Sequence, residues 1–130
     1  MQKISAQVVL INEEGKILCV SRKDNHSDFG LPGGKADPED NGDPIQTAIR
    51  ETKEETGLDV HDLKLIFAIH KYGFMNYTYV AKYSGTINFD EPHIVKWAPI
   101  KLATEGTFGV YNQLVAESLR DSNYEFIRHF

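Results

Sequence analysis

The chain has 130 residues, of which 41% are hydrophobic, and it contains no Ser- or Pro-rich linker, so we expect one domain spanning residues 1–130. Its formal net charge of −5 and the lack of a basic stripe argue against binding to a nucleic-acid polymer. No apolar stretch approaches the roughly twenty residues that cross a bilayer, and no signal-peptide pattern is present. We therefore expect a cytoplasmic protein without a membrane partner.

Two segments with the composition of β-strands open the chain, at residues 4–11 and 17–21. The segment from Asn12 to Lys16 between them contains the Asn and Gly that are typical of a hairpin turn. We expect the two strands to pair antiparallel. The single cysteine, Cys19, lies in an apolar run and is expected to be buried, which excludes a disulfide framework and a thiolate metal site.

A helix is predicted from Asp43 to Gly57. Asp is a favoured N-cap residue, Pro44 suits the first helical position, and Gly commonly ends helices. The face expected to pack consists of Ile45, Ala48, Ile49, Thr52 and Thr56.

Three carboxylates, Glu51, Glu54 and Glu55, lie within a neighbouring arc of about 100° on the same helix. Carboxylates at this spacing repel one another and destabilise an isolated helix by a few tenths of a kcal/mol per pair. A divalent cation would reverse that effect, and Mg²⁺ typically binds through a few carboxylates together with substrate phosphates. A solvated charged face is the alternative interpretation.

The rest of the chain combines strand patterns with one more helix. Strands are expected at residues 63–72, 77–83, 86–89 and 94–98, and an amphipathic helix from Gly109 to Arg120. Residues 124–130 are ambiguous. The aromatic residues Phe74, Tyr77 and Tyr79 could stack on a nucleobase, but packing within the sheet is the expected role for most of them. This order of elements predicts an α/β sandwich.

Gly33-Gly34-Lys35, followed by the nine residues from Arg50 to Leu58, resembles the signature of the Nudix hydrolase family, in particular its MutT-like branch. That signature reads Gly, five residues, Glu, seven residues, Arg-Glu, an aliphatic residue, any residue, Glu-Glu, any residue, Gly and an aliphatic residue. The resemblance implies a Nudix-type α/β/α sandwich with a mixed β-sheet.

The chain departs from the family signature in two places. Thr52 replaces the aliphatic residue, and Arg50 follows Gly34 by sixteen positions where the family has fourteen. The first Glu of the signature therefore has no counterpart. The acidic residues that could substitute for it are Asp37, Glu39, Asp40 and Asp43.

The resemblance also implies roles for individual residues. Glu51 would be the general base and Glu54 a second catalytic residue, while Arg50 would orient the carboxylates. The implied cofactor is Mg²⁺, which Mn²⁺ could replace, and its ligands would be Gly33 through its carbonyl group, Glu51, Glu54 and Glu55. A further acid, Glu91 or Glu105, could join the site from a later loop.

Five residues are candidates for substrate binding: Arg22, Lys23, Gly34, Lys35 and Asn112. Asn112 follows Phe108 by four positions and resembles the purine-reading Asn of MutT-like enzymes, since an amide can both donate to and accept from a base edge. The alternatives are an Asn that satisfies backbone groups at a helix start and, for Arg22 and Lys23, ordinary exposed residues at a strand end.

The function implied is that of a Mg²⁺-dependent nucleoside triphosphate pyrophosphatase, with 8-oxo-dGTP as a candidate substrate. One alternative is the hydrolysis of ADP-ribose or a dinucleoside polyphosphate. Another is a non-catalytic, nucleotide-sensing Nudix module, although binding alone would not require the three carboxylates. The partner expected is a small-molecule nucleotide, and the protein is expected to be a monomer or a homodimer.

Overall fold

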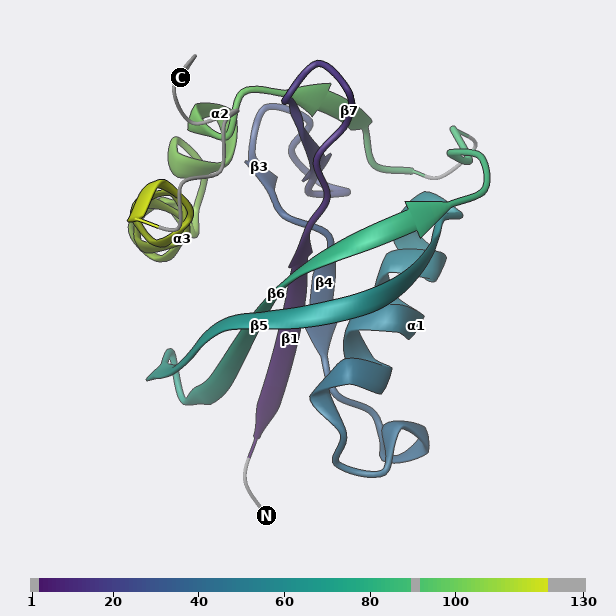
Figure 1. Cartoon of the computed structure of the whole chain (residues 1–130), viewed down its shortest axis with the longest axis vertical. Coiled ribbons are helices and arrows are strands. Elements are labelled where there is room, and N and C mark those ends of the chain that lie inside the picture. Colours follow the sequence, from purple (N-terminus) through teal and green to yellow (C-terminus); the bar gives the residue numbers. More distant parts are fainter. Residues whose placement is uncertain (1–2, 90–91, 122–130) are drawn as a thin grey trace.

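A computed structural model describes residues 3–89 and 92–121 (Figure 1). Its strands are β1 (Ile4–Val9), β2 (Ile17–Ser21), β3 (Phe29–Gly30), β4 (Gly33–Lys35), β5 (Asp59–Lys71), β6 (Phe74–Ser84) and β7 (Val95–Ala98). Its helices are the 3-10 turn η1 (Pro38–Asp40), α1 (Pro44–Thr56), α2 (Lys101–Thr104) and α3 (Gly109–Asp121). The predicted α/β sandwich with a mixed sheet is confirmed.

The strands form two sheets. The larger has the order β4-β1-β6-β5, with β1 parallel to β6 and antiparallel to β4, and the smaller has the order β3-β2-β7. Figure 1 shows α1 on one side of the larger sheet and α2 and α3 on the other. Each side has its own core: Ala48 of α1 packs in one hydrophobic cluster, and Val115 and Leu119 of α3 pack in the other.

The predicted pairing of residues 4–11 with residues 17–21 is correct only next to the turn. Asn12 Oδ1 accepts hydrogen bonds from the backbone N–H groups of Glu14 and Lys16, and an isolated bridge joins Ile11 to Ile17. Beyond this point β1 and β2 enter different sheets. Since β4 and β6 pair with the two edges of β1, neither edge is left for β2.

Other strand predictions need smaller corrections. β5 begins at Asp59, four residues earlier than expected, and β6 is longer at both ends. No strand forms at residues 86–89, where the Asn88 N–H instead donates to the Thr56 carbonyl at the end of α1 over 2.8 Å. The helix expected from Gly109 is confirmed. Residues 124–130 and Glu91 lie outside the described residues.

Helix α1 has the ends that its sequence predicts. Asp43 Oδ1 accepts a hydrogen bond from the Ile45 N–H over 2.9 Å, and Gly57 follows the helix with a φ of 83°. The predicted packing face is right at Ala48, Thr52 and Thr56, which are fully buried, but Ile45 is exposed. Thr47 is also fully buried. Its hydroxyl is satisfied there, since it donates to the buried carboxylate of Asp40.

Thr52, the residue that departs from the family signature, is fully buried, and its hydroxyl has no hydrogen-bond partner within the described chain. Replacing Thr52 with Val keeps the shape and removes this polar group, so we expect the free energy of unfolding to rise by about 1 kcal/mol. Thr56→Val is the matched control, because the Thr56 hydroxyl donates to the Thr52 carbonyl and accepts from the Leu58 N–H. We expect that variant to lose about 1 kcal/mol. Urea titration would measure the free energy of unfolding of both variants. A lower value for Thr52→Val would contradict the conclusion that the Thr52 hydroxyl is buried without a hydrogen-bond partner.

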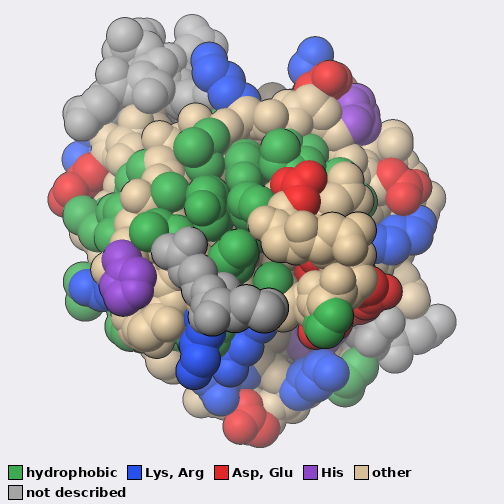
Figure 2. Space-filling model, turned by 90° about the horizontal axis from the view of Figure 1, so that it is seen from below, with side chains coloured by type: hydrophobic (Ala, Val, Ile, Leu, Met, Phe, Trp, Pro, Cys, Tyr) green, Lys and Arg blue, Asp and Glu red, His purple; other side chains and the backbone are tan. Residues whose placement is uncertain are grey.

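Hydrophobic side chains also remain at the surface. Figure 2 shows them gathered over the middle of the face seen from below. Leu65, Tyr72 and Phe108 are each about half exposed. Single exposed apolar residues are normal in folded proteins, but Tyr72 and Phe108 also line the cavity described below.

Candidate active site

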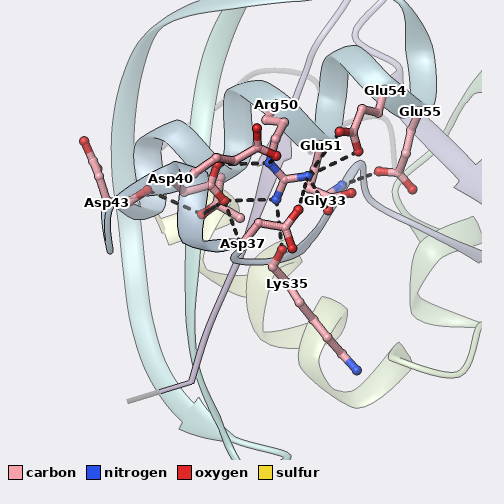
Figure 3. A network of polar contacts seen from close by, with 11 residues as sticks. Gly33, Lys35, Asp37, Asp40, Asp43, Arg50, Glu51, Glu54 and Glu55 are labelled. Carbon is pink, nitrogen blue, oxygen red and sulfur yellow. Dashed lines mark hydrogen bonds and ion pairs between the residues drawn. The ribbon is translucent and has the colours of Figure 1, made fainter. Parts of the chain in front are cut away.

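The glycine-rich strand β4 lies directly against the acidic edge of α1 (Figure 3). The Gly33 N–H donates to Glu55 Oε1 over 2.8 Å. A Cβ atom at Gly34 would lie 2.5 Å from Cδ of Glu51, so a larger residue there would displace this carboxylate from its present position. The two glycines therefore bring the backbone of β4 to two of the three carboxylates among the predicted metal ligands, Glu51 and Glu55.

Arg50 lies at the centre of the acidic cluster. Its Nε and Nη2 each donate to one carboxylate oxygen of Asp40 over 2.9 Å. Its Nη1 lies 3.1 Å from Oε1 of Glu51 and 3.2 Å from Oε2 of Glu54, and its Nη2 also reaches the Lys35 carbonyl. One guanidinium thus joins η1, β4 and the acidic edge of α1, as Figure 3 shows.

Asp40 is the acidic residue before α1 that Arg50 hydrogen-bonds through two nitrogens. Its side chain is only 3% exposed, whereas those of Asp37 and Glu39 are 54% and 67% exposed. Asp40 also accepts hydrogen bonds from the Thr47 hydroxyl and from the Asp37 N–H. The hydrogen bond from Arg50 lowers the pKa of Asp40 to about 2. The sequence offered several acidic candidates, and the structure selects this one as the partner of Arg50.

Burial disfavours the charged form of two of the three glutamates. It raises the pKa of Glu55 to about 8, against the opposing effect of the Gly33 N–H, and the nearby charge of Glu51 adds to the rise. Burial also raises the pKa of Glu51, which Arg50 partly offsets. A positive charge at this edge would stabilise both carboxylates.

The residues fit a divalent cation in their chemistry, since carboxylate and backbone carbonyl oxygens are the donors that Mg²⁺ prefers. In the described part of the chain, however, no three His, Cys, Asp or Glu side chains are arranged to hold a metal ion. Glu51 and Glu54 turn toward Arg50, and Glu55 turns toward Gly33. The residues that would hold the ion are Gly33, Glu51, Glu54 and Glu55, after the two Arg50 contacts give way.

A cavity of about 840 Å³ opens beside this cluster, within the size range of small-molecule sites. All five predicted substrate-binding residues line it: Arg22, Lys23, Gly34, Lys35 and Asn112. Their contact with a substrate stays a prediction. Gly33 and Glu55 also line the cavity, whereas Glu51 and Glu54 do not. Glu105 is exposed at the end of α2 and is not among the lining residues.

Asn112 is the most deeply buried polar group of the cavity wall. It is fully buried, its Nδ2 donates to the Ala103 carbonyl over 3.1 Å, and its Oδ1 has no partner among the described residues. An unsatisfied buried acceptor costs about 1–3 kcal/mol. The carbonyl oxygen of Asn112 is therefore a buried, unpaired acceptor behind the cavity wall.

Polar side chains that the sequence analysis missed extend along the wall next to Asn112. Gln7 Nε2 donates to the Thr78 hydroxyl over 3.1 Å, which lies 2.6 Å from the Tyr111 hydroxyl. Ser5 and Asn76 are hydrogen-bonded beside them. Polar residues at every second position of β1 and β6 were the available signal, since alternate residues of a strand share one face.

Two further residues line the cavity: His93, which the sequence analysis did not place in the site, and Phe74, one of its three aromatic candidates. His93 is buried, and its Nε2 lies 2.5 Å from the Glu55 carbonyl, to which it donates. Phe74 lines the cavity, whereas Tyr77 and Tyr79 belong to the hydrophobic core as expected. A buried His in a loop and one aromatic residue among several give no distinguishing pattern in the sequence.

Comparison with known proteins agrees with this geometry. A family model described as NUDIX domain matches residues 1–129, so the chain belongs to the Nudix family, a family of hydrolases that act on pyrophosphate bonds. Nudix hydrolases generally use divalent metals and act on small nucleotide substrates. No curated protein matches the sequence. Within the described residues, every helix is too short or too polar to span a membrane.

Several solved structures share the fold at low sequence identity. A MutT structure reported for Aliivibrio salmonicida and Vibrio cholerae is 18% identical with a TM-score of 0.75, covering 93% of this chain and 99% of that one. An ADP-ribose pyrophosphatase from Streptococcus suis is 19% identical, with a TM-score of 0.71 and coverage of 96% and 95%. A UDP-X diphosphatase is 16% identical, with a TM-score of 0.70 and coverage of 95% and 65%. At this level of identity the similarity shows the shared fold.

Proposed function

We propose that this protein is a Mg²⁺-dependent nucleoside triphosphate pyrophosphatase that releases a nucleoside monophosphate and pyrophosphate. The observation that carries the proposal is a single cavity that joins Glu55 and the two glycines of β4 to Arg22, Lys23 and the buried Asn112. Its lining offers what a nucleotide needs: a carboxylate and cations for the phosphates, and an amide for the base.

The chemistry assigned to the site is hydrolysis of the anhydride between the α- and β-phosphates. Water adds to phosphorus, the bridging P–O bond breaks, and Glu51 accepts the proton of the attacking water. Burial raises the pKa of Glu51, which makes its carboxylate a stronger base. Mg²⁺ held by Glu51, Glu54, Glu55 and the Gly33 carbonyl would supply neutralisation of the phosphate charge. Arg22 and Lys23, two exposed residues that directly follow β2, would contact the phosphates.

Asn112 is assigned to the base. Its Nδ2 is fixed by the Ala103 carbonyl, which directs the unpaired Oδ1 to accept from an amino or imino N–H of a purine. 8-oxo-dGTP is a candidate because oxidation at C8 converts N7 of guanine from an acceptor into a donor.

The test is a set of initial rates with Mg²⁺ for dGTP, 8-oxo-dGTP, dATP, dCTP, ADP-ribose and diadenosine tetraphosphate. We expect the triphosphates to be preferred, and Asn112→Ala to raise KM for the best purine roughly tenfold or more, as the loss of a base contact implies. Gln113→Ala changes an exposed neighbour on α3 and is the matched control. Turnover of only the diphosphate-linked compounds would replace the proposal, and binding without turnover of any compound would favour a nucleotide sensor.

A further inference from the structure

The residues just before β7 are hydrogen-bonded to the end of β2 and to the loop that follows it. Ile94 pairs with Ser21, the last residue of β2, in both directions: its N–H donates to Ser21 Oγ over 2.7 Å, and its carbonyl accepts the Ser21 N–H over 2.8 Å. Two residues earlier, the Pro92 carbonyl accepts a hydrogen bond from Nε2 of His26 over 2.8 Å. The segment of residues 92–94 is therefore held against β2 and the loop after it.

The middle residue of this segment, His93, contacts α1 instead. Its Nε2 donates to the Glu55 carbonyl over 2.5 Å, and the residue is only 6% exposed although it lines the cavity. The carbonyl groups in the last turn of a helix have no partner within the helix. His93 supplies one for Glu55, and the Asn88 N–H supplies one for Thr56. One buried side chain thus joins the end of α1 to a segment that is bound to the smaller sheet.

Glu55 is held at both its backbone and its side chain. Its carbonyl accepts from His93, and its Oε1 accepts from the Gly33 N–H over 2.8 Å. On the other side of the His93 contact, Arg22 and Lys23 directly follow β2, to which the chain next to His93 is bound. This contact therefore sets the position of one predicted Mg²⁺ ligand relative to the two cations that are predicted to contact the phosphates.

We propose that His93 is a positioning residue: by holding the Glu55 carbonyl, it keeps the Glu55 carboxylate in place for the cation and keeps α1 aligned with the phosphate-binding residues after β2. This inference rests on the proposed function. His93 acts through Glu55 and not by contact with the metal or the substrate. Removing a group that orients a metal ligand typically lowers metal affinity or activity by 10–100-fold, and a misplacement of about 1 Å in a site can lower the rate by roughly 10²-fold.

Two replacements of His93 separate its hydrogen bond from its bulk. Leu fills the space without a donor, whereas the side-chain nitrogen of Gln lies as many bonds from Cα as Nε2 of His and can donate to the Glu55 carbonyl. We expect His93→Leu to weaken the binding of Mn²⁺ alone roughly tenfold, as measured from the EPR signal of the free ion, and to lower kcat for dGTP by a similar factor while KM changes less. His93→Gln should restore most of both.

Thr56→Val is the matched control for stability. It removes a hydroxyl that donates to the Thr52 carbonyl and accepts from the Leu58 N–H at the same end of α1, and it leaves the hydrogen bond to the Glu55 carbonyl in place. We expect its Tm to fall while its affinity for Mn²⁺ and its kcat for dGTP stay close to those of the unchanged protein. A change in stability alone is thereby separated from a change in position.

Mn²⁺ titrations and initial rates for dGTP, each at a temperature well below the Tm of every variant, decide the inference. Weaker Mn²⁺ binding in His93→Leu that is restored in His93→Gln and absent from Thr56→Val supports the positioning role. A lower Tm in His93→Leu with unchanged Mn²⁺ affinity and kcat overturns it and leaves the proposed function standing. If the unchanged protein binds Mn²⁺ but turns over no dGTP, the proposed function is overturned, and the Mn²⁺ titrations still decide the role of His93.

Discussion

Turnover of dGTP should fall by about a hundredfold or more when Glu51 or Glu54 is replaced by Gln, because each change removes a charge assigned to proton transfer or to cation binding. Folding should change little. The Glu54 side chain is 56% exposed. In Glu51→Gln, the oxygen of the new amide can still accept the hydrogen bond from Arg50. Initial rates at saturating Mg²⁺, together with the Tm, would measure the two effects separately.

Glu117→Gln is the matched control for these variants, since it removes the same charge from an exposed position on α3. It should keep full turnover. Full activity in both Glu51→Gln and Glu54→Gln would contradict the assignment of the site to the acidic edge of α1. A fall in Tm that accompanies the fall in rate would instead indicate that the two carboxylates serve the structure through Arg50.

Replacing Asp40 with Asn should lower the free energy of unfolding by about 2 kcal/mol at neutral pH. The pKa of Asp40 is about 2 in the folded protein against an ordinary value of 3.8, and each unit corresponds to about 1.4 kcal/mol. Because the folded-state pKa is lowered, this contribution is fully present above about pH 4 and is lost as the pH falls toward 2. The difference between the two proteins should therefore shrink over that range, as urea titrations at several pH values would show.

Asp37→Asn is the control for the Asp40 prediction. Asp37 also lies near Arg50, 3.4 Å from Nη1, but its side chain is more than half exposed. Exposed ion pairs contribute little, so this variant should lose at most about 1 kcal/mol. Equal losses in Asp37→Asn and Asp40→Asn would show that Arg50 has no preferred partner in η1.

Local signals in the sequence were sufficient for the helix that carries the site. Asp43, Pro44 and Gly57 define the ends of α1 through contacts within a few residues, and its 3.6-residue period places Glu51, Glu54 and Glu55 along one edge. These features of α1 depend on neighbours in the sequence, which one chain displays directly. The place of Gly33 at that edge, in contrast, was implied only by the resemblance to the Nudix signature.

Features that depend on distant segments could not be predicted. The selection of Asp40 over Asp37 and Glu39 follows from the burial of Asp40 between η1 and α1, and burial of that kind is not visible in a run of acidic residues. The separation of β1 and β2 into two sheets follows from competition for the edges of β1.

The aromatic part of the cavity was missed for the same reason. Phe74, Tyr77 and Tyr79 were all candidates for base stacking, but their strand pattern alone favoured packing. Tyr72 and Phe108 meet only because the β5–β6 turn and the segment before α3 approach each other in space. Tyr72 is unusual because its backbone φ is positive, and this conformation can be seen only in the three-dimensional structure.

The most direct test of the central claim is to identify the products formed from dGTP by the unchanged protein with Mg²⁺, with and without EDTA. Anion-exchange chromatography should show dGMP and pyrophosphate in equal amounts, and EDTA should abolish both. Formation of dGDP and phosphate would contradict cleavage between the α- and β-phosphates. No product from any triphosphate, combined with cleavage of ADP-ribose or diadenosine tetraphosphate, would contradict the assignment of this cavity to nucleoside triphosphates.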